Sequence, residues 1–157
     1  MAKYTTTFEG VAVSAAQDLV SLKAAAAVPI RILRYWVNAI DTSLPVSQML
    51  ELRARLLPAT VTQGSGGTVP TPQKIGSQGD AAAVTTAHVN DTSKATTGGT
   101  AVITDEQGCH IYNGYDSAIQ GRDPLTVAAA AGFVWELLST VSGTVHLSGG
   151  VDWEEIT

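Results

Sequence analysis

Charge is scarce in this chain of 157 residues. Only 15% of its residues are charged, whereas about a quarter is usual for globular domains. Nine basic residues stand against 14 acidic ones, so the net charge is −5. A nucleic-acid-binding protein needs a basic face, and we therefore expect no direct binding to nucleic acid. A surface with so little charge is common where partner proteins cover much of it.

Disulfides and long apolar runs are also missing. Cys109 is the single cysteine, so no disulfide can form within the chain and the fold must rest on packing. No apolar run is long enough to cross a bilayer, and the first ten residues, MAKYTTTFEG, lack the apolar region of a signal peptide. We therefore expect a cytosolically made protein without a membrane partner. We also expect one domain over residues 1–157.

Apolar and polar residues alternate along most of the chain. This period of two is typical of β-strands, and turn signals such as Asn113-Gly114 recur about every ten residues. The segments with this pattern are residues 4–13, 19–22, 29–40, 83–89, 100–104, 109–112, 125–127, 133–138, 144–147 and 151–156. The pattern predicts an all-β protein, an antiparallel jelly roll or β-sandwich of about eight to ten short strands with long loops.

Residues 48–57 fit two interpretations. The sequence MLELRARLL has good helix propensity. A strand, however, places Leu50, Leu52 and Ala54 on one face and the charged Arg53 and Arg55 on the other. That separation is cleaner, and the neighbouring segments are strands, so we predict a strand that Pro58 ends.

The segment 58–82 is rich in glycine, threonine and proline and has few residues to bury. Such a stretch gains little from packing to offset its ordering entropy, and loops of this length inside a domain are usually functional or disordered. We predict an extended loop that lies against a partner, with a flexible hairpin tip at residues 64–67.

No pattern of reactive residues points to catalysis. His88, His110 and His146 lie on separate segments, and Cys109 and His110 would face opposite sides of a strand. A cupin-like metalloenzyme would require at least two of these histidines to converge. The carboxylates of Asp105, Glu106 and Asp116 are expected in solvated turns without a calcium-loop pattern, and no serine lies in a G-x-S-x-G elbow. We therefore predict no enzyme activity, cofactor or metal.

The three tryptophans allow two interpretations. Trp36, Trp135 and Trp153 would form a sugar-stacking platform if they were exposed together, but buried tryptophans are more common in sheets. In the closing VDWEEI we expect Trp153 to point inward, or into an interface, while its carboxylate neighbours face water. A carbohydrate- or receptor-binding β-sandwich therefore remains an alternative function.

Three stretches of the chain resemble a known group of proteins. The opening YTTTFEGVAVSAAQDLVSLKAAAAVPIRILRYWV, the loop QGSGGTVPTPQ and the closing VDWEEI resemble small proteins encoded among the structural genes of tailed bacteriophages. The chain is similar to jelly-roll head decoration (cement) proteins, over most of its length but without an active-site motif. The resemblance implies a non-enzymatic virion protein, assembled in the host cytoplasm. It would form a homotrimer on the capsid surface and clamp the major capsid protein. A module of a phage tail or fibre is the corresponding form of the carbohydrate-binding alternative.

We expect the partner contacts in loop 58–82 and in the N-terminal segment. The residues predicted to make them are Tyr4, Phe8, Gln63, Ser65, Thr68, Pro70, Pro72 and Lys74.

Overall fold

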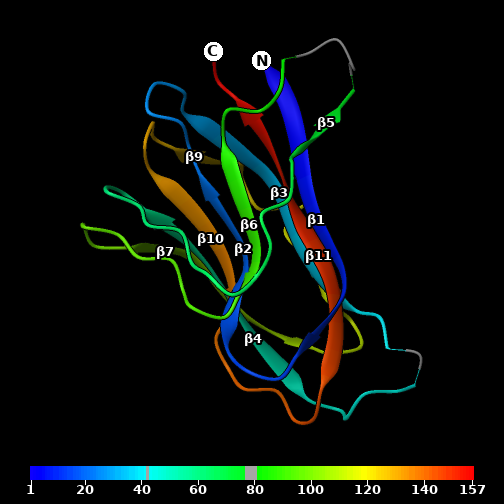
Figure 1. Cartoon of the computed structure of the whole chain (residues 1–157). Helices are drawn as coiled ribbons and strands as arrows, with labels where there is room; N and C mark the ends of the chain where they lie inside the picture. The colour runs from blue at the N-terminus through cyan, green and yellow to red at the C-terminus, as the bar shows by residue number, and fades with distance from the viewer. Residues whose placement is uncertain (42, 77–80) are drawn as a thin grey trace.

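The computed structural model describes residues 1–41, 43–76 and 81–157. Eleven strands in this part of the chain form two antiparallel sheets that pack face to face (Figure 1). The prediction of an all-β sandwich is confirmed. No helix that is long and apolar enough to cross a membrane occurs among the described residues.

The sheets draw their strands from all along the sequence. Sheet A has the order β5-β1-β11-β3-β8, and β9 also pairs with β3. Its strands are β1 Ala2–Val13, β3 Ile30–Ala39, β5 Gln73–Ile75, β8 Tyr115–Asp116, β9 Leu125–Val127 and β11 Val145–Glu155. Sheet B has the order β6-β2-β10-β4-β7. Its strands are β2 Gln17–Lys23, β4 Met49–Leu57, β6 Thr86–Asp91, β7 Val102–His110 and β10 Gly132–Leu137. The strand predicted at residues 48–57 is confirmed as β4.

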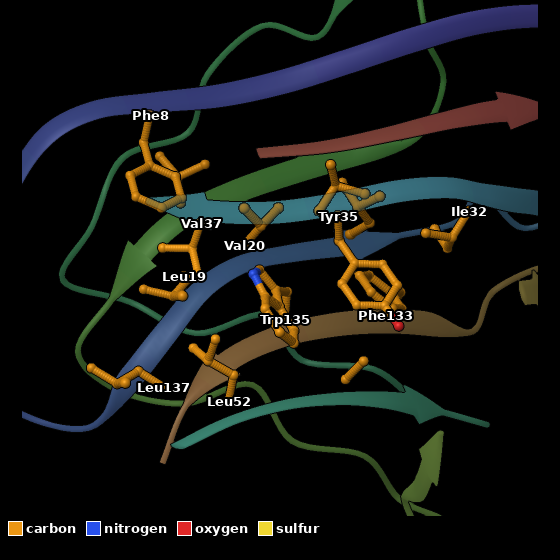
Figure 2. Close-up of a cluster of buried hydrophobic side chains, with 14 of the residues drawn as sticks. Phe8, Leu19, Val20, Ile32, Tyr35, Val37, Leu52, Phe133, Trp135 and Leu137 are labelled. Carbon is orange, nitrogen blue, oxygen red and sulfur yellow. The ribbon is translucent and has the colours of Figure 1, made fainter. Parts of the chain in front are cut away.

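The main core lies between the two sheets. Figure 2 shows Phe8 of β1 and Tyr35 of β3 facing Trp135 of β10, and all three side chains are buried. The Tyr35 ring centroid is 4.9 Å from that of Trp135 and 5.5 Å from that of Phe133. Burial of such large apolar groups is the main source of stability for a fold without a disulfide.

The sequence pattern ends a strand before residues 105–108 and another before residues 148–150, but both strands continue through these residues. Strand β11 runs through Gly149 and Gly150, and β7 runs through residues 105–108. A Cβ atom at Gly149 would lie 2.4 Å from the Trp36 carbonyl oxygen, and one at Gly150 would lie 2.5 Å from that of Thr6. These glycines therefore permit a close approach of neighbouring strands and do not mark a turn.

The outer face of sheet B carries a second, smaller core. Leu57, Val61, Ala95 and Val134 are buried together there, under loops that follow β4 and β6. This covering explains why all six residues of β10 are buried. A strand that is covered on both faces loses the simple alternation of apolar and polar residues.

Candidate interaction surface

Residues 59–75 of the predicted loop 58–82 lie along the edges of its own domain, and residues 77–80 lie outside the part of the chain that the structure describes. We call residues 59–75 the edge ribbon. Thr62, Ser65 and Thr68 form single antiparallel bridges with Thr96, Ser93 and Val89, with backbone N···O distances of 2.9–3.0 Å in both directions. The ribbon then ends in β5, which pairs with Lys3–Thr5 at the edge of sheet A (Figure 1). It therefore covers an edge of both sheets.

Two glycines allow the edge ribbon to pack closely against the domain. A Cβ atom on Gly64 would lie 2.1 Å from the Ser93 carbonyl oxygen, and one on Gly67 would lie 2.0 Å from that of Val89. Only glycine allows the backbones to approach so closely. The backbone amide of Gly67 also donates to Asp91 Oδ1 at 3.2 Å. The structure thus differs from the flexible tip predicted at residues 64–67, because these glycines pack against the domain.

Six of the eight predicted contact residues lie on the edge ribbon. Ser65, Thr68 and Lys74 are exposed, and Pro70 and Pro72 are half-buried. The Gln63 side chain instead turns toward the domain. Its Nε2 donates to the Ser21 carbonyl at 3.2 Å, and its Oε1 accepts from the Thr86 hydroxyl at 2.7 Å.

The other two predicted contact residues, Tyr4 and Phe8, are buried in the core, contrary to the prediction. Tyr4 and Phe8 are only 1% and 5% exposed. The alternation of β1 points Tyr4, Thr6 and Phe8 to the same inner face, so these side chains are not available to a partner. The Tyr4 hydroxyl donates to the Ala81 carbonyl at 2.8 Å.

A row of charged residues crosses sheet B. Asp91, Asp18, Glu136, Arg53 and Glu106 are register partners on successive strands from β6 to β7. Like charges that face each other across strands are destabilising, so the buried carboxylates of this row need compensation. The sequence pattern gives no sign of the row, because its members are far apart along the chain.

Glu136 receives most of that compensation. Its carboxylate is fully buried and is contacted by Arg53 Nε at 2.6 Å, Lys94 Nζ at 2.9 Å and Arg55 Nε at 3.1 Å. Burial alone would raise the pKa of Glu136, but the hydrogen bonds from Lys94 and Arg53 and the nearby Arg55 charge hold it below its ordinary value. Lys94 belongs to the loop that covers the sheet, so this ion pair also anchors the loop.

Asp18 is compensated less well. Its Oδ2 accepts from the Ala95 amide at 2.6 Å, but its Oδ1 has no hydrogen-bond partner and lies 3.8 Å from Arg55. Burial is the main reason why the pKa of Asp18 rises to about 6, and the neighbouring Glu136 charge adds to the rise. Because Arg55 also donates to the Ala95 carbonyl at 3.0 Å, both backbone polar groups of this loop residue are bound by charged side chains of sheet B.

Another buried carboxylate, that of Asp105, joins the two sheets. Asp105 of β7 accepts hydrogen bonds from the hydroxyls of Tyr35, at 2.9 Å, and Tyr115, and pairs with Arg122 at 2.8 Å. Burial and the adjacent Asp105 raise the pKa of Tyr115 to about 12, so its phenol stays protonated and remains a donor. Asp105 was predicted in a solvated turn, but β7 continues through it and turns its side chain inward.

The histidines have separate partners. His88 Nδ1 lies 3.1 Å from Asp91, and His146 Nδ1 lies 2.6 Å from Asp41. His110 Nε2 lies 3.0 Å from the Ser47 hydroxyl, while its Nδ1 faces the Tyr112 amide at 3.4 Å. A neutral His110 ring whose Nδ1 accepts from the Tyr112 amide carries its proton on Nε2. Nε2 then donates to the Ser47 hydroxyl, so the ring is not placed to take a proton from Ser47. Across residues 1–41, 43–76 and 81–157, no three His, Cys, Asp or Glu side chains gather to hold a metal ion.

The tryptophans form no common platform. Trp135 and Trp153 are fully buried. Trp36 is half-buried on β3, and the Arg34 guanidinium covers its ring at 4.5 Å from the centroid. Arg34 in turn forms a fork with Asp116, with N···O distances of 3.1 and 2.6 Å. The exposed ring surface that a sugar would need is therefore small.

The tail carboxylates differ from their predicted solvent exposure. Glu154 is buried and pairs with Arg31 at 2.7 Å. Glu155 is also buried, where its Oε1 accepts from the backbone amides of Val84 and Thr85, both at 2.9 Å, and from the Thr85 hydroxyl at 2.8 Å. These charges are satisfied because β11 lies inside sheet A between β1 and β3.

Comparison of the chain with models of protein families, with curated proteins and with solved structures gave no match. The edge ribbon combines a fixed backbone with exposed polar side chains.

Proposed function

We propose that this chain is a non-enzymatic virion structural protein that decorates the capsid shell of a tailed bacteriophage by binding the major capsid protein. The observation that carries the proposal is the edge ribbon. Its backbone is already held against the domain, whereas Ser65, Thr68 and Val69 expose their side chains, Val69 by 67%. A surface that is ordered before binding loses little entropy when a partner docks.

The low charge of the edge ribbon supports the same proposal. Between residues 59 and 75, Lys74 is the single charged residue. Small uncharged side chains cost little to desolvate when a partner covers them. Many copies on one shell would then turn a modest affinity per site into strong overall attachment.

The strand order supports a jelly-roll assignment. We count β8 and β9, which both pair with β3, as one strand. Apart from β5 and β6, sheet A then has the order β1-β11-β3-β8/β9 and sheet B has the order β2-β10-β4-β7. Successive strands from β1 to β4 therefore alternate between the sheets. We infer the eight-strand jelly roll from this order, with β5 and β6 as additions on one side. A cyclic homotrimer on the outer capsid surface, formed in the host cytoplasm, is the assembly that we propose for it.

Exposed substitutions on the edge ribbon test the proposal without disturbing the core. In the variant S65E/T68E, two carboxylates stand on the outer side of the ribbon. We expect its thermal unfolding to match that of the unchanged protein. Its affinity for empty shells of the major capsid protein should fall at least about tenfold, because buried unpaired charges are costly.

The matched control is T100E/T126E, which adds the same two charges at exposed positions outside the ribbon. The proposed contact predicts shell binding by this control close to that of the unchanged chain. Equal binding by both variants would show that the edge ribbon does not contact the shell.

A further inference from the structure

We propose that an exposed apolar patch at one end of the sandwich binds a segment of the shell protein in which apolar side chains are flanked by Lys or Arg. The inference rests on the proposed function only for the source of that segment. The chemistry of the segment follows from the patch itself.

The patch consists of four large apolar side chains. Leu44, Val46, Met49 and Tyr112 are 87%, 58%, 57% and 50% exposed. We call them the distal patch, because β4 begins at the end of the sandwich that lies away from both chain termini (Figure 1). Single exposed apolar residues are common on proteins, whereas several side by side indicate an interaction site.

Hydrogen bonds and a strand pairing bring the two parts of the distal patch together. The Tyr112 hydroxyl donates to the Pro45 carbonyl at 2.8 Å, and the Ile111 amide donates to the Gln48 carbonyl at 3.0 Å. Met49 is also the register partner of His110. Residues 45–49 therefore lie directly beside residues 110–112, which brings the exposed side chains of the two segments to the same end of the sandwich.

The segment that carries most of the patch is held in place. Gln48 Nε2 donates to the Ser142 carbonyl at 3.1 Å, and Gln48 Oε1 accepts from the Ser142 amide at 2.7 Å. This pair of bonds fixes the segment to the turn after β10. An apolar surface that is already ordered binds at a lower entropic cost.

Two carboxylates lie on the same sheet beyond the distal patch. Glu51 is exposed two positions along β4 from Met49, and it shares a shallow hollow of about 350 Å³ with the exposed Glu106 and with Gln107, Gly108 and Leu138. Within the described residues neither carboxylate forms an ion pair. Arg53, which lies opposite Glu106 in the sheet, is engaged by Glu136. The border of the patch is therefore acidic and uncompensated.

The charge of this border identifies the partner chemistry. Residues 43–50 and 108–115 contain no Asp, Glu, Lys or Arg, so Glu51 and Glu106 are the unpaired charges that these two segments lead to. A second copy that docked patch to patch about a two-fold axis would bring these carboxylates toward their own counterparts, which is unfavourable. A segment with Lys or Arg beside its apolar side chains matches both the patch and its border.

The first experiment uses the isolated protein and a short capped peptide, Lys-Leu-Lys-Leu-Lys. Amide NMR shifts should change at residues 43–51 and 106–112. The L44S/M49S variant should bind at least about tenfold more weakly, since each buried apolar side chain contributes strongly. The matched control is I103S/I119S, in which the side chains are 54% and 82% exposed elsewhere, and it should bind as the unchanged chain does.

The second variant pair tests the acidic border. E51Q/E106Q should weaken peptide binding about three- to tenfold at low salt and much less at high salt. The control E9Q/D123N removes the same charge from other exposed positions and should have little effect. Equal binding of a Glu-Leu-Glu-Leu-Glu peptide, or shifts outside the patch, would overturn the inference.

The third experiment compares the same variants on shells. Loss of shell binding in L44S/M49S, but not in I103S/I119S, is the expected result. If the unchanged protein binds the basic peptide at the patch but no shells, the capsid assignment fails and the inference about partner chemistry stands. Concentration-dependent dimers that L44S/M49S abolishes would instead assign the patch to a second copy and contradict the inference.

Discussion

At the scale of single residues, the buried carboxylates are the most informative feature. Asp18, Asp105 and Glu136 are all buried, and each is bound by a different set of donors. A buried charge is tolerated only when it is paired or when it is neutralised by a proton. Glu136 is paired with cations and its pKa is lowered, whereas burial raises the pKa of Asp18 to about 6, so the two should affect the pH dependence of stability in opposite directions.

The pH dependence of stability should reveal Asp18. Its folded-state pKa of about 6 lies above the ordinary value of 3.8. The folded state therefore holds the proton more tightly, and the stability that this proton contributes is lost as pH rises through about 6. The stability of the unchanged chain relative to D18N should fall by about 2 kcal/mol between about pH 4.5 and pH 7.5. Urea unfolding across this range measures the difference.

The comparison with D18N cancels the opposite contributions of Glu136 and Asp116, whose pKa values are lowered. D123N, at an exposed site, serves as the control and should track the unchanged chain. A stability difference for D18N that does not vary with pH would contradict the account of this residue.

Gly149 should be intolerant of any side chain. A Cβ atom there would lie 2.4 Å from the Trp36 carbonyl oxygen and 3.0 Å from the Phe8 ring. We expect G149A to lose about 2 kcal/mol or more of unfolding free energy, because backbone and core must shift. G108A is the matched control within a strand, since its Cβ would meet only the mobile end of Met49 at 3.4 Å. A similar loss in both variants, measured by urea unfolding, would argue against this reason.

At the scale of elements, loops of sheet B act as a third layer. The loop after β6 is attached through Lys94 to Glu136 and through Ala95 to Asp18 and Arg55. The edge ribbon is then attached to that loop through the bridges from Thr62 and Ser65. The position of the proposed contact surface thus depends on charged residues inside sheet B.

Removing the central charge should therefore destabilise the chain. E136Q leaves Arg53, Arg55 and Lys94 around a neutral amide, and we expect a loss of about 3 kcal/mol. E106Q changes an exposed member of the same row and should alter stability by less than about 0.5 kcal/mol. Urea unfolding at neutral pH measures both, and a small effect of E136Q would show that the cations find other partners.

The edge ribbon can be detached by one substitution. In G67A the new Cβ would lie 2.0 Å from the Val89 carbonyl oxygen, so the ribbon should separate from β6 locally. Hydrogen exchange at the amides of Thr68 and Val89, which bond to each other's carbonyls, should become much faster. G108A is the control, because its Cβ would meet only the end of the Met49 side chain, at 3.4 Å. Unchanged protection in G67A would mean that the ribbon is not held by this contact.

The sequence predicts strands well where one face is apolar. In β4, Leu50, Leu52 and Ala54 are buried as their alternation indicates. The sequence predicts the environment of a residue poorly where contacts with residues far along the chain determine it. Gly149 looks like a turn residue, and Asp105 looks like a solvated one, because neither the Trp36 backbone nor the Tyr35 hydroxyl is visible from the local pattern.

The candidate site shows the same limit. Loop 58–82 is recognisable from its composition, which predicts partner contacts at Ser65 and Thr68, and both residues are exposed in the structure. The sequence does not predict the bridges to residues 89–96 that hold the loop, because they join polar segments without an apolar pattern. The distal patch was missed because Leu44, Met49 and Tyr112 look like ordinary strand and turn residues until their exposure is known.

At the scale of the whole molecule, the described surfaces fit a protein that attaches to other proteins. The edge ribbon covers one side of the sandwich, and the distal patch lies at one end of it. Both surfaces are held by hydrogen bonds before any partner arrives. We expect binding that is close to rigid-body docking.

The most direct test is co-sedimentation of the purified chain with empty shells of the major capsid protein. The account predicts that the chain sediments with the shells and saturates at a fixed number of copies per shell. A chain that stays in the supernatant at every concentration, while remaining folded, would contradict it.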